Sequence, residues 1–260
     1  MLLPRPILVP TTLLGGAFAA WIVTYQRMQG MDAGPGTALG GLGWYLGIWV
    51  TMMAAMMLPS AVPMVLAFNR VSAERARQES PLAVRTWVFV AGYLVAWTAY
   101  GLLAYAVYRT AKSVAPHFLG WSSGGRYVAA AALVAAGLYE LTPLKEVCLR
   151  RCRLPFHVVV RGWRGGPLGA LRMGADHGLS CVGCCWGLML ALFAVGVMSI
   201  AWMVIIAAAI FVEKVAPRGQ LLTWPLGVLL LGLAIWIAVS PGSVPWLVEP
   251  GMGGMTGMDM

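Results

Sequence analysis

Residues 179–216 read LSCVGCCWGLMLALFAVGVMSIAWMVIIAAAIFVEKVA, an apolar run that charged residues interrupt only near its end. A membrane-spanning helix needs about 20 apolar residues, so this run is too long for one span and just long enough for two. We therefore predict a tight helical hairpin around Met198-Ser199, with helices over residues 179–197 and 200–216. Two consecutive segments of this kind are typical of an integral membrane protein.

The composition of the whole chain points to the same class. Hydrophobic residues make up 60% of the 260 residues and charged residues only 10%, whereas a soluble domain carries about 25% charged residues. We expect an all-α integral membrane protein with seven transmembrane helices, or six if the hairpin is a single span. The other five expected helices cover residues 7–25, 43–68, 86–108, 127–147 and 222–240.

The basic residues predict how the chain is oriented. With a cytoplasmic N-terminus, 14 of the 18 lysines and arginines fall in cytoplasmic segments, and the exceptions are Arg27, Arg109, Lys112 and Arg126. The positive-inside rule therefore predicts an extracytoplasmic C-terminus in the bacterial cytoplasmic (inner) membrane. The net charge of +9 is explained by this topology and by anionic lipid headgroups, so no nucleic-acid partner is expected.

The expected domain organisation is simple. One transmembrane bundle covers residues 1–240, and a Met/Gly-rich extracytoplasmic tail covers residues 241–260 and resembles copper-capture segments. Ala17-Phe18-Ala19 could be a signal cleavage pattern, but apolar residues continue beyond it, which favours an uncleaved helix. The longest loop is expected at residues 148–177. The sequence has no nucleotide-binding or hydrolase motif, so no catalytic residue is assigned.

Four residues with metal-binding side chains lie at the start of the apolar run: His177, Cys181, Cys184 and Cys185. Positions three or four apart share a helix face, so these side chains are expected to point the same way. Thiolates beside an imidazole suit soft ions such as Cu(I), with Zn(II) as the alternative. The sequence lacks the two separated Cys-x-x-Cys pairs of a zinc finger. Plain packing of small thiols is the competing interpretation.

Other candidate ligands lie on neighbouring helices. Glu140 is expected at about the depth of Cys185 if the fourth and fifth helices are neighbours, and a carboxylate at that depth usually has a function. The second expected helix carries a stripe of thioethers, which bind Cu(I) without losing a proton, although methionine also fills apolar cores. The candidates on this helix are Met52, Met53, Met56 and Met57.

Two further features are expected near the cytoplasmic surface. Cys148 and Cys152 form a second thiol pair, four residues apart and flanked by basic residues, and are additional candidates for binding metal. Glu213 and Lys214 are expected to form an ion pair at the membrane interface. All five cysteines then lie on the cytoplasmic side, where thiols stay reduced, so structural disulfides are not expected.

Four stretches together carry a resemblance. They are Trp49-x-x-Met52-Met53-x-x-Met56-Met57-x-Pro59-Ser60-x-x-Pro63-Met64, Tyr139-Glu140-Leu141-Thr142-Pro143-Leu144-Lys145-x-x-Cys148-x-x-x-Cys152, Gly174-x-x-His177-Gly178-x-x-Cys181-x-Gly183-Cys184-Cys185-Trp186 and Glu213-Lys214. Over roughly residues 40–216 the chain resembles a bacterial domain-of-unknown-function family described as predicted metal-binding integral membrane proteins. The resemblance implies a multi-helix membrane protein that binds a metal, with no established reaction.

The sequence therefore predicts a membrane-embedded protein that binds a soft metal, with copper favoured, for transfer, delivery or storage. The expected partners are membrane lipids and either a metallochaperone or a larger membrane complex. Two other classes stay open. One is a non-catalytic accessory subunit of a larger membrane complex, and the other is a thiol-redox membrane protein in which a cysteine pair cycles.

Overall fold

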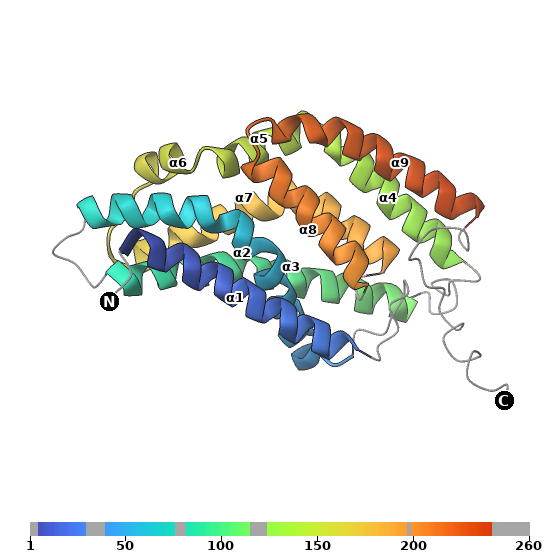
Figure 1. Ribbon diagram of the computed structural model, residues 1–260. Coiled ribbons are helices and arrows are strands. Elements are labelled where there is room, and N and C mark those ends of the chain that lie inside the picture. Colours follow the sequence, from blue (N-terminus) through green and yellow to red (C-terminus); the bar gives the residue numbers. More distant parts are fainter. Residues whose placement is uncertain (1–4, 30–39, 76–81, 115–123, 197–198, 241–260) are drawn as a thin grey trace.

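The computed structural model describes residues 5–29, 40–75, 82–114, 124–196 and 199–240, and the regular elements within these residues are all helical (Figure 1). The methionine-rich tail expected at residues 241–260 lies outside the described residues. In chain order the elements are α1 (Arg5–Met28), α2 (Leu42–Arg75), α3 (Leu82–Val114), α4 (Arg126–Glu140), α5 (Pro143–Arg153), α6 (Pro155–Arg161), α7 (Gly166–Val195), α8 (Ile200–Val215), the 3₁₀ helix η2 (Gly219–Leu222) and α9 (Thr223–Val239).

Within the described residues, four helices are long and apolar enough to cross a membrane, namely α2, α7 and the segments Leu8–Met28 of α1 and Val84–Val114 of α3. A fifth candidate is the pair α4 and α5, which meet at a bend of 66°. Helices α8 and α9 coincide with the last two expected spans, but their 16 and 17 residues fall short of the roughly 20 of a full span. For the part of the chain that the structure describes, the all-helical architecture is confirmed, and four or five spans meet the length and composition that crossing a membrane requires.

The helix expected over residues 127–147 is broken between α4 and α5. Pro143 opens α5, and a proline disfavours helical backbone at the residue before it. Thr142 is accordingly extended, with φ −83° and ψ 147°, and its side chain caps α5. The loop expected over residues 148–177 is wrong, because these residues complete α5, form α6 and begin α7 at Gly166.

Helices α3 and α7 pack closely because each presents glycine to the other's backbone. A Cβ atom added at Gly174 would overlap the carbonyl oxygen of Phe89, and one added at Gly92 would overlap that of Leu171. Small residues allow helix backbones to approach in this way. The close packing brings the middle of α3 against the cysteine-bearing part of α7.

Helix α2 contributes much of the core. Figure 1 shows that α2 bends near its middle, and Pro59 and Pro63 lie within that helix. A proline removes a backbone hydrogen bond and commonly produces such a bend. The four methionines of the expected thioether stripe are all buried: Met52, Met53, Met56 and Met57.

Candidate metal centre

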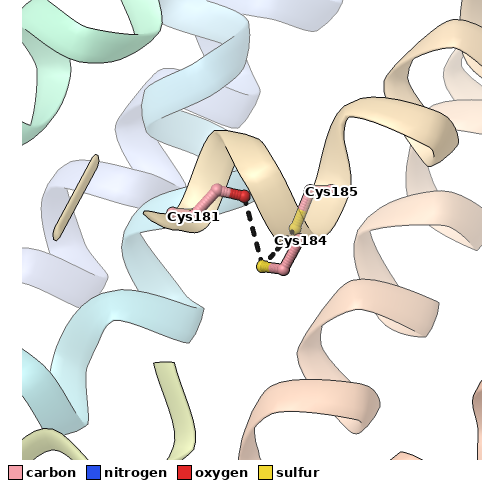
Figure 2. A group of neighbouring side chains, drawn as sticks. All are labelled: Cys181, Cys184 and Cys185. Carbon is pink, nitrogen blue, oxygen red and sulfur yellow. Dashed lines mark hydrogen bonds between the residues drawn. The ribbon is translucent and has the colours of Figure 1, made fainter. Parts of the chain in front are cut away.

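Three cysteines of α7 bring their sulfur atoms to within 4.8 Å of one another. They are Cys181, Cys184 and Cys185, and no more than 1% of any of them is exposed. The Cys184 Sγ lies 3.3 Å from the Cys185 Sγ and 3.2 Å from the backbone carbonyl oxygen of Cys181 (Figure 2). These three residues, called the thiol cluster below, share one face of α7, as their spacing predicts.

Helix α5 brings the second thiol pair to the same place. The Cys152 Sγ lies 3.7 Å from the Cys184 Sγ. Cys148 packs over Gly183, where an added Cβ atom would lie 2.9 Å from the Cys148 Sγ. All five cysteines therefore meet where α5 lies against α7. The sequence could not establish this proximity, because the path of the chain between the two helices was unknown.

A buried lysine faces the thiol cluster. Lys214 of α8 is 8% exposed, and its Nζ donates a hydrogen bond to the Cys181 Sγ at 2.8 Å. The hydroxyl oxygen of Tyr93 in α3 lies 3.0 Å from the same sulfur. A positive charge in contact with sulfur offsets the negative charge that thiolates bring into an apolar interior. Residues of α3 and α8 thus contact the sulfur of Cys181.

A separate buried network contains Glu140, Lys145 and Glu213. The Lys145 ammonium contacts the Glu140 carboxylate and lies 2.8 and 2.9 Å from the two carboxylate oxygens of Glu213. All three residues are at most 3% exposed. Glu140 faces the protein interior, as its depth predicts, and its partner there is a lysine.

This network changes the expected roles of the neighbouring charges. Glu213 and Lys214 do not point at each other as a pair, because successive residues on a helix project about 100° apart. Glu213 reaches Lys145 instead, and Lys214 reaches Cys181. The guanidinium of Arg153 also has hydrogen-bond partners, since it donates to the carbonyl oxygens of Ala216 at 2.7 Å and Pro217 at 2.8 Å.

His177 lies outside the thiol cluster. Its ring stacks on Tyr93 and Phe89 at centroid separations of 5.5 and 6.3 Å, and the residue is buried. Among the described residues, the group of mutually close metal-binding atoms consists of the three cysteines. His177 instead lines a nearby pocket, together with Met64 of α2.

Three buried residues at or near the site were missed as parts of it. Lys145 was counted only among the cytoplasmic positive charges, Lys214 was expected to pair with Glu213, and Tyr93 carried no signal at all. Lys214 follows a long apolar stretch in α8, and a lysine in that position is a sign of a buried partner. Identifying that partner required the packing of α8 against α7.

No curated protein and no solved structure matches the chain significantly. A family model described as "PpoB2: Copper chaperone" matches residues 46–237. The matched region contains all five cysteines and both buried lysines, and it extends beyond the earlier resemblance into α9. Helix α1 lies outside it. Because the match covers more than half of the 260 residues, the chain belongs to the PpoB2 family, whose description is copper chaperone.

Proposed function

We propose that this protein is a membrane-embedded copper carrier that binds Cu(I) between the thiolates of Cys181, Cys184 and Cys185 and passes it on. The observation that carries the proposal is the buried thiol cluster, with its sulfur atoms within 4.8 Å of one another. Soft thiolate ligands select soft ions. Membership of a family described as copper chaperone supports copper as the cargo.

The ligand set favours Cu(I) over Zn(II). Structural zinc sites are almost always four-coordinate and tetrahedral. The thiol cluster offers three mutually close sulfurs, and the imidazole of His177 is not part of it. The sulfur of Cys152 lies 3.7 Å from that of Cys184 but does not belong to the mutually close group. Cu(I) accepts a small number of soft ligands, so three thiolates suffice. The ammonium of Lys214 adds positive charge, which suits a monovalent ion held by several thiolates.

The other candidate residues have different roles in this proposal. Cys148 and Cys152 are exchange ligands, because α5 places them beside the thiol cluster. Glu140 is assigned to the ion network with Lys145 and not to the metal. The buried thioethers of α2 form a second, deeper place for Cu(I): Met52, Met53, Met56 and Met57.

In the membrane, this proposal places the thiol cluster toward the cytoplasmic side of a seven-helix bundle. The N-terminus is cytoplasmic, and the methionine-rich tail of residues 241–260 lies across the membrane. The clustered basic residues and the four or five span-length helices support this arrangement. Transfer is favoured over storage, because extra thiols beside the cluster allow Cu(I) to change ligands without becoming free.

Competitive titration of detergent-purified, reduced protein against a chromophoric Cu(I) chelator tests the proposal. We expect tight binding by the wild type and a loss of at least 100-fold in affinity in the C181S/C184S/C185S variant, because a hydroxyl is a hard ligand. The matched control is A170S/A191S/A194S, which adds three hydroxyls at other buried positions of α7. Unchanged affinity in the cysteine variant would end the proposal and favour an accessory subunit.

A further inference from the structure

A pocket of about 460 Å³ opens beside the thiol cluster. Buried side chains from α2, α3 and α7 line its inner part, and exposed residues such as Arg151 and Leu179 line its outer part. Soft metal ligands are frequent in its wall. They are the thioethers of Met64 and Met173, the imidazole of His177 and the thiol of Cys148.

The sulfurs of the thiol cluster are not accessible from the protein surface. Its three cysteines are at most 1% exposed, and none of them lines the pocket. Among the five cysteines, all of which lie in the described part of the chain, Cys148 alone lines it. An ion that enters the pocket therefore meets Cys148 before it meets the cluster.

Cys148 also touches the helix that carries the cluster. Its sulfur lies over Gly183, where an added Cβ atom would be 2.9 Å away, so glycine leaves the space that this sulfur occupies. Gly183 is the residue directly before Cys184. One helical turn further along α5, the Cys152 Sγ lies 3.7 Å from the Cys184 Sγ. Positions four apart share a helix face, so α5 directs both sulfurs toward α7.

We propose that this pocket is the exchange port through which Cu(I) reaches the thiol cluster, and that Cys148 transfers the ion across its inner wall. The inference rests on the proposed function. Cu(I) arrives bound to a small thiolate carrier, since the pocket has room for more than a bare ion. Arg151 and Asp176 bring opposite charges to the pocket wall, so its charge does not select the carrier.

The transfer is a pair of ligand exchanges in which copper stays monovalent. A bond from copper to the Cys148 sulfur forms as the bond to the carrier sulfur breaks, and the Cys148 thiol proton goes to the departing carrier thiolate. A bond to Cys184 then replaces the bond to Cys148, and the Cys184 proton passes to Cys148. Met64 and His177 assist in the pocket, since thioethers and neutral imidazoles bind Cu(I) without releasing a proton.

Stopped-flow loading of the full-length protein from the Cu(I) complex of glutathione, a small thiolate carrier, tests this inference. We expect C148S to load at least tenfold more slowly than wild type while its equilibrium affinity for Cu(I) changes by less than about threefold. The S180F variant narrows the pocket from α7 and should slow loading in the same way. The matched control is V147F, a bulky substitution at an exposed position of α5 outside the pocket, which should load like wild type.

Two results would overturn the inference. Loading at the wild-type rate in both C148S and S180F would mean that the ion takes another route. A parallel loss of rate and affinity in C148S would make Cys148 an equilibrium ligand and not a transfer residue. Failure of the proposed function has a different signature, because wild-type protein would then take no copper from the glutathione complex.

Discussion

Lys214 supplies the thiol cluster with a positive charge before any metal arrives. Its Nζ lies 2.8 Å from the Cys181 Sγ in a place where water does not reach the sulfur. Several thiolates in an apolar interior repel one another, and a lysine in contact with them reduces that repulsion. Under the proposed function, the thiol cluster therefore holds Cu(I) between more than one thiolate without a large excess of buried negative charge.

The K214L variant should bind Cu(I) about tenfold to a hundredfold more weakly than wild type. Leucine removes the charge without adding a sulfur ligand, and a hydrogen bond to a charged group contributes about 1.5–3 kcal/mol. The measurement is equilibrium competition against a Cu(I) chelator. K112L, at an exposed lysine of α3, serves as the control and should bind like wild type. Equal affinities in the two variants would remove Lys214 from the site.

At the residue scale, the sequence predicts what depends on one helix and fails where two helices must meet. The shared face of Cys181, Cys184 and Cys185 follows from spacing alone. The contacts of Lys214 and Tyr93 with Cys181 do not, because they depend on how α8 and α3 pack against α7. Contacts between different helices cannot be derived from the spacing of residues within one helix.

Among the helices, α5 is held at both ends by charged side chains. Near its start, Lys145 contacts the carboxylates of Glu140 in α4 and Glu213 in α8. At its end, Arg153 donates to carbonyl oxygens that follow α8. The short helix with Cys148 and Cys152 is therefore fixed in position relative to α4 and α8.

Substitution K145M should destabilise the protein by about 3–5 kcal/mol, because it leaves two buried carboxylates without a partner. The control is R150M, which removes an exposed i,i+4 pair with Glu146 and should change stability by no more than about 0.5 kcal/mol. Denaturant unfolding in detergent, followed by circular dichroism, measures both. If K145M and R150M have the same free energy of unfolding, the buried network does not stabilise the packing of α4, α5 and α8.

The close packing of α3 and α7 makes a second prediction about the helices. G174A should destabilise the protein by about 1–3 kcal/mol, because the new Cβ atom would overlap backbone that cannot rotate away. G16A in α1 is the control, since nothing lies within 4 Å of its added Cβ atom. Thermal unfolding in detergent compares them. A G174A midpoint at or above that of G16A would contradict the packing described for α3 and α7.

The existence of the helices could be predicted from apolar runs, but their ends could not. Pro143 was a readable signal for the break between α4 and α5, since proline restricts the residue before it. Residues 166–178 are different. They form the first turns of α7 although they carry charged residues and lack a long apolar run, and packing against α3 stabilises them there.

For the whole molecule, the bias of basic residues predicts which end of the bundle faces the cytoplasm. A C-terminal fusion of the full chain to alkaline phosphatase should be active, because that enzyme needs an oxidising, extracytoplasmic location. The same C-terminal fusion to green fluorescent protein should not fluoresce. Fusions that end in the segment after α6 are the controls and should give the opposite pair of signals. The same signals from both fusion points would refute the predicted orientation.

The 3.3 Å between the sulfurs of Cys184 and Cys185 has a toxicological consequence. Neighbouring reduced thiols are also the target of arsenite and mercury, which are thiol-seeking like Cu(I). Burial keeps the cluster from water but does not distinguish among such elements once they enter. If the protein carries Cu(I) as proposed, it is therefore vulnerable to poisoning by these elements while it is empty, and bound Cu(I) protects it by occupying the sulfurs.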